Sequence, residues 1–310
     1  MKPTLPHQEK ILITGSDGFV AQHLKAELSK SGAKLFNYDV KRKNDITDYE
    51  NIRLWLDKVK PDKVFHLAAQ AFVPESYSNP QRTFIINTIG SINLLEAIKN
   101  LGLKTKVLLA GTSEEYGDAR DSVSSEEDDG VYEWSLPQPK SPYAVSKLAM
   151  TLMGQIYAKS YGVHVVCTRA FNHTGPGRGE MYAESSWAKQ IAEIEVGKRE
   201  YLEHGNLKTR RNYTDVRDVV HAYALAINLE PDIYNICSDQ NLLMKEVLDI
   251  LIGLSEKEIK TKVNPALSRP SDFSFYEPVN DKFVQLTGWE IQHKMYDSME
   301  DLLDYWRARV

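Results

Sequence analysis

The chain opens with a short apolar run that gives way to a turn and then to a helical pattern. Lys10–Thr14 is apolar at most positions, as in a strand buried on both faces. Residues 15–18 contain two glycines and form the turn, and Val20, Leu24 and Leu28 follow at helical spacing. These residues predict a strand, a tight turn and a helix, in that order.

The alternation of apolar runs with helical segments continues along the chain. Further strand-sized runs occupy residues 34–38, 63–67, 106–109, 163–168 and 232–236. Segments of helical period, such as residues 52–59 and 85–98, separate most of them. Strands that alternate with helices predict an α/β fold with a doubly wound parallel sheet, covered by helices on both faces.

The regular alternation ends near Gly175. Predicted helices at residues 185–197, 216–228 and 298–307 are separated by polar stretches. We therefore expect a smaller C-terminal α/β domain that covers the substrate and is interleaved with the last strand of the sheet. The predicted division gives residues 1–173 and 213–240 to the first domain, and residues 174–212 and 241–310 to the second.

Composition narrows the class of protein. The chain has 310 residues, of which 42% are apolar and 26% are charged, so it can bury a large core. The formal net charge is −5 and the basic residues are scattered, which argues against nucleic acid or an anionic membrane as the main partner. The acidic segment 118–133 fits a solvated loop.

Targeting and redox signals favour the cytoplasm. No apolar run approaches the about 18 residues that span a bilayer. Residues 1–10 hold two prolines and no apolar segment, so neither a secretory signal nor a membrane anchor is expected there. The two cysteines, Cys167 and Cys237, lie in strand-like stretches, which excludes a disulfide framework.

The glycine turn is the first candidate site. In such a turn, one glycine makes the bend, the next lets the backbone approach a pyrophosphate, and the helix N-terminus faces the negative charge. Ala21 stands where a third glycine is usual. This is the pattern of a Rossmann-type dinucleotide fold, although two glycines also occur in strand-to-helix turns that bind nothing.

Asp39 closes the second predicted strand, about 20 residues beyond the turn, where a carboxylate accepts hydrogen bonds from ribose hydroxyls. A 2′-phosphate would meet this charge unfavourably, so NAD(H) is favoured over NADP(H). Lys41 and Arg42 could accommodate the phosphate if the loop bends back, and Asp39 could instead only open a solvated turn. Asp45 and Ile46 are placed to touch the adenine edge.

The segment His66-Leu-Ala-Ala-Gln70 ends the third strand. Ala68 and Ala69 leave space where a flat cofactor would pass the edge of the sheet. Small residues also serve ordinary packing of a helix on a sheet, so this segment alone does not discriminate between the two.

Tyr143 and Lys147 are the main catalytic candidates. They stand four residues apart, on one face of a helix that begins at Pro142. A lysine ammonium lowers the pKa of a neighbouring phenol, which suits the phenol to exchange a proton with a sugar hydroxyl. Such pairs are also common on solvated helices. Thr112 favours the catalytic interpretation, because it follows the run at 106–109 and could hold a substrate alcohol against Tyr143.

Together these motifs resemble the extended short-chain dehydrogenase/reductases, a family of NAD-dependent epimerases and dehydratases. The matching segments are Thr14-Gly-x-x-Gly18, His66-Leu-Ala-Ala69, Thr112, Tyr143-x-x-x-Lys147 and Arg169-x-Phe-Asn172. The resemblance implies that Thr112 orients the reacting hydroxyl, Tyr143 is the acid/base and Lys147 holds the nicotinamide ribose. The cofactor site predicted in this way comprises Gly15, Asp17, Gly18, Phe19, Val20, Asp39, Asp45, Ile46, Leu67, Ala68, Ala69, Tyr143 and Lys147.

Within that family the chain is similar to the GDP-mannose branch, which contains GDP-6-deoxy-4-keto-D-mannose reductases and GDP-mannose 4,6-dehydratases. The segments that carry this similarity are residues 111–117, 170–177, 188–191, 205–218, 234–238 and 264–270. The resemblance implies a GDP-hexose bound by Asn172, Lys189, Arg211 and Arg269, a nucleotide-sugar-binding second domain, and a homodimer. Arginines match phosphate oxygens, although Lys189 and Arg211 could equally be solvated. No spacing of His, Cys or carboxylates suggests a metal site.

Several functions remain open at this point. Reduction at C4 of a 4-keto-6-deoxy sugar needs only Thr112, Tyr143 and Lys147, and we take it as the first hypothesis. In 4,6-dehydration Glu114 would be the base that removes the C5 proton. If the segment that follows Thr112 is extended, Glu114 lies on the same side as Thr112 and Glu115 points away. A 4-epimerase, a decarboxylase and a non-catalytic dinucleotide-binding regulator are less favoured alternatives.

Overall fold

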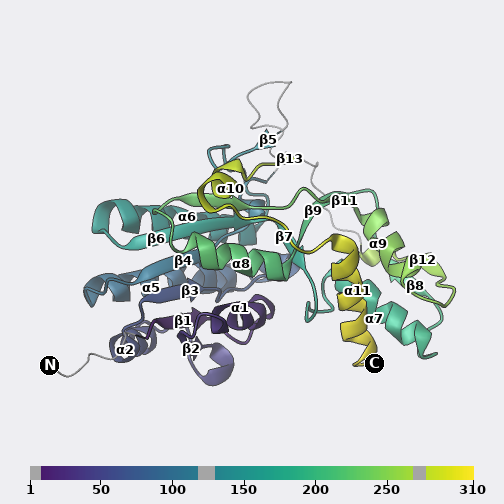
Figure 1. Cartoon of the computed structure of the whole chain (residues 1–310), viewed down its shortest axis with the longest axis horizontal. Helices are drawn as coiled ribbons and strands as arrows, with labels where there is room; N and C mark the ends of the chain where they lie inside the picture. Colours follow the sequence, from purple (N-terminus) through teal and green to yellow (C-terminus); the bar gives the residue numbers. More distant parts are fainter. Residues whose placement is uncertain (1–7, 118–129, 268–276) are drawn as a thin grey trace.

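The computed structural model describes residues 8–117, 130–267 and 277–310 (Figure 1). Six parallel strands form the central sheet, in the order β10-β6-β4-β3-β1-β2. They are β1 (Lys10–Thr14), β2 (Lys34–Tyr38), β3 (Lys63–His66), β4 (Lys106–Ala110), β6 (His164–Ala170) and β10 (Ile233–Ile236). The predicted doubly wound parallel sheet is confirmed, and each of the six predicted apolar runs forms one of its strands.

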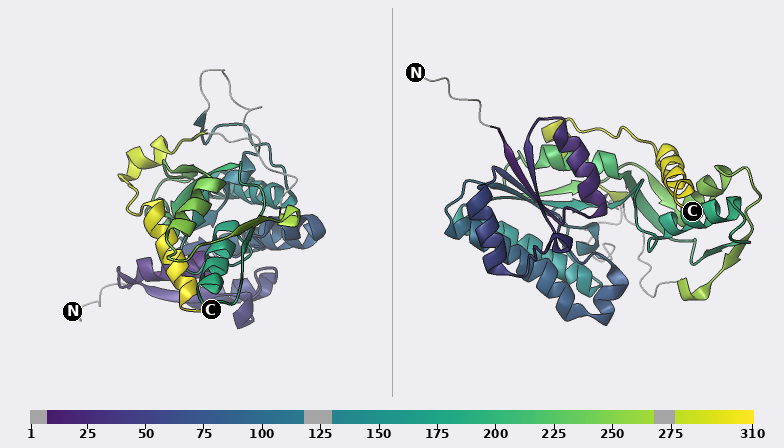
Figure 2. Two further views of the ribbon diagram at one scale, coloured as in Figure 1. Left: turned by 90° about the vertical axis from the view of Figure 1, so that its right-hand side faces the viewer. Right: turned by 90° about the horizontal axis from the view of Figure 1, so that it is seen from below.

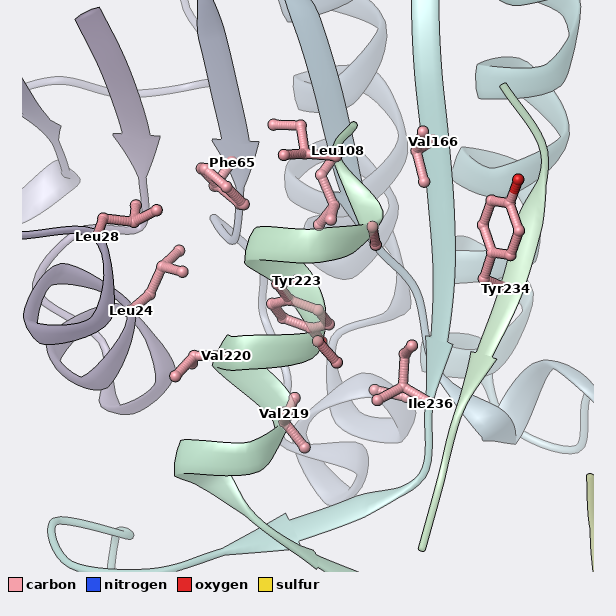
Figure 3. Packing of buried hydrophobic residues seen from close by; sticks show 14 of the residues in the cluster. Leu24, Leu28, Phe65, Leu108, Val166, Val219, Val220, Tyr223, Tyr234 and Ile236 are labelled. Carbon is pink, nitrogen blue, oxygen red and sulfur yellow. The ribbon is translucent and has the colours of Figure 1, made fainter. Parts of the chain in front are cut away.

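Helices cover both faces of this sheet, because successive strand residues point to opposite sides. In β1, Ile11 and Ile13 pack toward α1 (Phe19–Ser29) and α8 (Val216–Ala226). Figure 3 shows residues of the same cluster on these two helices, such as Leu24 and Val220. Leu12 packs on the other side, toward α2 (Tyr49–Val59), α5 (Gly90–Asn100) and α6 (Pro142–Tyr161). All three β1 side chains are at most 1% exposed.

A second, smaller domain lies beside the sheet (Figures 1 and 2). Its helices are α7 (Ala183–Glu195), α9 (Met244–Gly253) and α11 (Met295–Arg307). Two small sheets accompany them: β7 (Asn172–Thr174), β9 (Arg210–Asp215) and β11 (Asn241–Leu243) form one, and β8 (Leu202–His204) and β12 (Thr261–Val263) form the other. Trp187, Leu251, Met299 and Leu302 belong to a separate hydrophobic core in this domain.

One segment differs from the predicted domain division. Helix α10 (Asp281–Thr287) and Trp289 pack in the core of the first domain, where Phe283 is completely buried. The indole Nε1 of Trp289 donates a hydrogen bond to the carbonyl oxygen of Asp218 in α8 at 3.1 Å. The chain therefore returns to the first domain before α11 completes the second.

The remaining elements are short. They are the 3₁₀ turns η1 (Val40–Arg42), η3 (Ser113–Glu115) and η5 (Pro265–Leu267), the helices α3 (Val73–Ser78) and α4 (Pro80–Phe84), the π-helical turn η2 (Ile85–Ile89), and the paired strands β5 (Gly130–Val131) and β13 (Glu277–Pro278). In the part of the chain that the structure describes, no helix is both long enough and apolar enough to cross a membrane.

Candidate functional site

A cavity of about 350 Å³ opens at the carboxyl ends of β1, β3, β4 and β6. We call it the sheet-edge cavity. Ligands of open α/β sheets bind at this edge, beyond the carboxyl ends of the strands. The predicted site residues that line it are Gly15, Gly18, Phe19, Val20, Leu67, Ala69, Thr112, Glu114, Tyr143, Lys147 and Asn172.

The glycine turn has the geometry of an anion-binding loop. Gly15 has a φ of +67°, and a Cβ there would lie 2.7 Å from the backbone nitrogen of Ala68, so only glycine lets the turn pass the end of β3. Gly18 precedes α1, and no side chain of the described residues caps this helix. The buried hydroxyl of Ser16 likewise has no hydrogen-bond partner among the described residues. The amide groups at this helix start are available to a phosphate.

Asp39 faces this turn from the end of β2. Its carboxylate accepts hydrogen bonds from the backbone nitrogens of Asp17 at 3.0 Å and Lys41 at 2.9 Å. The loop does bend back, because Arg42 Nη2 and Nε meet the two oxygens of the Asp17 carboxylate at 2.8 and 2.9 Å. This pairing lowers the pKa of Asp17 and raises that of Arg42. The charge of Arg42 is therefore already shared with Asp17.

The segment after β4 forms a turn, whereas the placement of Glu114 beside Thr112 was expected for the case of an extended segment. Thr112 caps η3, where its hydroxyl accepts a hydrogen bond from the Glu114 backbone nitrogen at 3.3 Å, and Glu115 Oε1 accepts one from the Thr112 backbone nitrogen at 3.2 Å. The segment is therefore not extended, because this capping box closes a 3₁₀ turn and satisfies two backbone donors at once. Glu114 nevertheless lines the sheet-edge cavity, while Glu115 is completely buried outside its lining.

Tyr143 and Lys147 lie in the first turns of α6, which Ser141 caps. Lys147 Nζ donates a hydrogen bond to the carbonyl oxygen of Ala110 at 2.7 Å, and burial lowers the pKa of the ammonium to about 8. Burial, and after it the Glu114 carboxylate, raise the pKa of Tyr143. This direction is opposite to the one predicted from the lysine spacing, because burial dominates. The phenol keeps its proton and can donate it.

A second cavity of about 440 Å³ adjoins the first. We call it the interdomain cavity, because segments of both domains line it. Phe72, Asn172, Arg178 and Tyr182 line both cavities. Arg211, on β9, lines the interdomain cavity, so the structure brings two of the predicted substrate residues, Asn172 and Arg211, to the same space.

Lys189 is placed differently from the prediction. It lies on α7, and within the described ranges it lines neither cavity. Its ammonium pairs with Glu180 and Glu193 and stands 5.5 Å from the ring centroid of Trp306. The phase of α7 turns Lys189 toward α11 instead of toward the cavities.

Other predicted residues also lie away from the cavity. Ile46 is buried against Gly90 on α5, and Asp45 accepts hydrogen bonds from the backbone nitrogen and hydroxyl of Thr47 at 2.9 Å. Neither lines the sheet-edge cavity among the residues described. Arg269, and most of the acidic segment 118–133, lie outside the described residues.

Arg178 is a site residue that sequence reasoning missed. Its guanidinium stands 3.5 Å from the ring centroid of Tyr182 and 3.7 Å from the carboxylate of Glu184. Its buried Nε has no hydrogen-bond partner in the described part of the chain. The available signal was its position directly after Gly177, where a segment already matched to the nucleotide-sugar branch ends. The aromatic neighbours Phe72 and Tyr182 carried no comparable signal.

This fold, with a Tyr-x-x-x-Lys pair lining the cavity at the carboxyl edge of the parallel sheet, defines the extended short-chain dehydrogenase/reductase class. The family model described as GDP-mannose 4,6 dehydratase matches residues 37–302. The chain therefore belongs to the GDP-mannose 4,6-dehydratase family of nucleotide-sugar enzymes.

Individual relatives agree with this assignment. The chain is 31% identical over 306 residues to a GDP-6-deoxy-D-mannose reductase of Pseudomonas aeruginosa, covering 97% of this chain and 98% of the relative. It is 30% identical to GDP-mannose 4,6 dehydratase 1 of Arabidopsis thaliana, over 79% of this chain and 68% of the relative. Among solved structures, RMD from Pseudomonas aeruginosa complexed with NADPH superimposes with a TM-score of 0.86, 30% identity, and coverage of 98% and 100%. A Thermus thermophilus UDP-glucose 4-epimerase in complex with NAD superimposes with a TM-score of 0.84 and 28% identity, covering 97% of this chain and 100% of that chain.

Proposed function

We propose that this protein reduces the C4 keto group of GDP-4-keto-6-deoxy-D-mannose with a nicotinamide cofactor. The observation that carries the proposal is the placement of the buried Tyr143 with Thr112 and Lys147 in the lining of the sheet-edge cavity, which adjoins the interdomain cavity. A relative that matches this chain over nearly its whole length is a GDP-6-deoxy-D-mannose reductase.

The sheet-edge cavity fits a nicotinamide dinucleotide. Its pyrophosphate would be held by the backbone amides of the glycine turn and the start of α1, where Gly15 and Gly18 leave the backbone accessible. Leu67, Ala69 and Lys147 also line this cavity. A reduced nicotinamide bound there would supply the hydride that reduces the sugar ketone.

The protein side chains would then handle the proton. Tyr143 donates its phenolic proton to the C4 oxygen, and the Thr112 hydroxyl orients the same oxygen by a hydrogen bond. Lys147, as an ammonium, holds the cofactor ribose and stabilises the phenolate that remains after proton transfer. Reduction needs a proton donor at this position, and because burial raises the pKa of Tyr143, the Lys147 charge is needed to make the phenol an effective donor.

The substrate diphosphate is assigned to the interdomain cavity. Arg178 and Arg211 line this cavity, and guanidinium groups bind phosphate oxygens through paired donors. The Nε of Arg178, which lies 3.7 Å from the Glu184 carboxylate and makes no hydrogen bond to the described residues, is one such donor. Asn172, which lines both cavities, would contact the substrate between its diphosphate and the reacting sugar.

One observation favours a second candidate, the 4,6-dehydratase reaction. Glu114 lines the sheet-edge cavity near Tyr143, and its carboxylate accepts a hydrogen bond from the Ser141 hydroxyl at 3.4 Å. A carboxylate in this position could remove the C5 proton of a 4-keto sugar. Reduction breaks no C5–H bond, so in a reductase Glu114 has only a packing or hydrogen-bonding part.

Product analysis separates the two reactions. We expect wild-type protein to convert GDP-4-keto-6-deoxy-D-mannose, with reduced cofactor, into a product heavier by two hydrogen atoms, and Glu114→Gln to keep most of this activity. The proposal is overturned if wild type instead converts a GDP-hexose into its 4-keto-6-deoxy form without added reductant, with loss of water, and Glu114→Gln abolishes that conversion.

We further propose NAD(H) as the favoured cofactor and a homodimer as the assembly. Asp39 opposes a 2′-phosphate, and Arg42, which would supply the charge for NADP(H), is shared with Asp17. The dimer surface is an apolar stripe of exposed residues on α6 and the neighbouring π-helical turn η2. The stripe consists of Ile85, Ile89, Val145, Leu152 and Ile156, each 40 to 50% exposed.

A further inference from the structure

Glu115 is a completely buried carboxylate that the proposed chemistry does not use. Its Oε1 accepts hydrogen bonds from the backbone nitrogen of Thr112 at 3.2 Å and from the Thr151 hydroxyl at 3.0 Å. Its Oε2 accepts a hydrogen bond from Arg169 Nε at 2.9 Å. One side chain of η3 thereby joins the end of β4, the middle of α6 and the end of β6.

Its partner Arg169 is as enclosed as Glu115, with a side chain only 2% exposed. The guanidinium lies 4.5 Å from the ring centroid of Tyr116, and Nη1 donates a hydrogen bond to the carbonyl oxygen of Glu133 at 3.1 Å. A buried ion pair contributes little net stability, because the loss of hydration offsets much of the attraction. Because Glu115 accepts a hydrogen bond from the backbone of Thr112, a residue of the proposed chemistry, we look for a functional role of the pair.

The backbone is shaped around this carboxylate. A Cβ at Gly111 would lie 2.6 Å from Glu115 Oε1 and 2.5 Å from the carbonyl oxygen of Thr168, so the position admits only glycine without rearrangement. Gly111 directly precedes Thr112. The close approach of Glu115 and the orientation of Thr112 are thus parts of one arrangement.

We propose that the Glu115–Arg169 ion pair is a positioning element, which holds the Thr112 hydroxyl and the Glu114 carboxylate at the sheet-edge cavity and brings a negative charge to Thr151, one helical turn from Lys147 on α6. Glu115 acts through these neighbours and touches neither cavity. The inference deepens the proposed function and rests on it, because Thr112 and Lys147 receive their roles there.

The charged and titratable groups around Lys147 support an electrostatic effect of Glu115 on this lysine. Tyr143 lies on the same helix, Glu114 lines the same cavity, and Glu115 and His66 interact electrostatically with Lys147. Burial and then Lys147 lower the pKa of His66 to about 3, so this imidazole is neutral. Burial lowers the pKa of Lys147 to about 8, and Glu115 opposes that shift. Without the Glu115 charge, Lys147 loses its proton at a lower pH.

Two substitutions separate charge from geometry. Glu115→Gln keeps the length and the hydrogen-bond acceptor but removes the charge, so the alkaline limb of kcat/KM should move down by about half a pH unit or more. Glu115→Asp keeps the charge, but its shorter side chain cannot span from Thr112 to Arg169. The alkaline limb of the kcat/KM profile should then stay at the same pH, while kcat falls about tenfold with little change in KM. Thr105→Val serves as the control: it removes a buried hydroxyl that donates to the Pro61 carbonyl oxygen at 2.6 Å, next to the opposite end of β4, and should change neither quantity appreciably.

The readouts distinguish failure of this inference from failure of the proposed function. Binding of reduced nicotinamide cofactor can be followed by its fluorescence across the same pH range and needs no sugar substrate. In Glu115→Gln the pH at which this binding weakens should move down by the same amount as the alkaline limb of kcat/KM. If Glu115→Gln fails to fold, the double variant Glu115→Gln/Arg169→Met removes both charges and should shift the limb in the same way. An unchanged limb in the folded variants, with activity lowered equally at every pH, overturns the positioning role. Absence of wild-type reduction overturns the proposed function, while the cofactor-binding limb still tests Glu115.

Discussion

Replacement of Tyr143 by phenylalanine isolates the single proton that reduction requires. The side chain is 9% exposed, and phenylalanine retains the ring that fills this space. Only the hydroxyl and its hydrogen bonds are removed, so we expect the free energy of unfolding to change by no more than about 1 kcal/mol. A positioned acid contributes about 10² to 10⁴ in rate, which corresponds to about 3 to 5 kcal/mol in the activation barrier. The loss of turnover should therefore far exceed the loss of stability.

The assay compares kcat, cofactor affinity and thermal stability in the same preparation. Tyr157→Phe is a matched control, because Tyr157 lies on the same helix, is 4% exposed and donates a hydrogen bond from its hydroxyl to Glu96 at 2.7 Å. This control removes a hydroxyl from another buried ring of the same helix but should leave kcat unchanged. The reasoning is refuted if Tyr143→Phe keeps near wild-type turnover, or if both variants lose turnover to the same degree.

Two further predictions concern the cofactor and the assembly. Calorimetry should show that wild type binds NADH more tightly than NADPH. Asp39→Ala should reduce this preference by about tenfold, because it removes a negative charge that repels the 2′-phosphate. Equal or tighter binding of NADPH by wild type would show that the charge of Arg42 decides the cofactor preference. Leu152→Glu, in the apolar stripe of α6, should convert a dimer into monomers in light scattering, whereas Leu54→Glu on α2, which is also exposed, should not. A monomeric wild type, or a dimer that survives Leu152→Glu, would contradict the proposed surface.

Local pattern was sufficient to predict most of the fold. Lys10–Thr14 and Ile233–Ile236 form strands because their apolar residues fill a sheet buried on both faces, which is the property that the sequence pattern records. The return of α10 to the first domain was not predictable in this way. It depends on Phe283 and Trp289 meeting α8 and β10, and contacts between distant segments leave no periodic signal.

The turn after β4 was predictable in principle. Thr112-Ser-Glu-Glu115 has the Thr-x-x-Glu form of a capping box, and this form predicts a helical turn better than an extended segment. The positions of Lys189 and Arg178 were not predictable to the same degree. Lys189 lies on a helix whose rotation is set by packing against α11, and Arg178 reaches the cavities through its stacking on Tyr182. In both cases tertiary packing decides which side chain enters the site.

The repeated passage of the chain between the two domains limits how such a protein can be divided or recombined. After β6 the polypeptide enters the second domain, returns for α8 and β10, leaves again for α9, returns for α10 and ends in α11. No single cut separates the two domains into autonomous pieces, and neither can be exchanged as one continuous cassette. A new sugar preference on this scaffold must therefore arise from changes in the individual crossing segments, each of which also carries part of the shared framework.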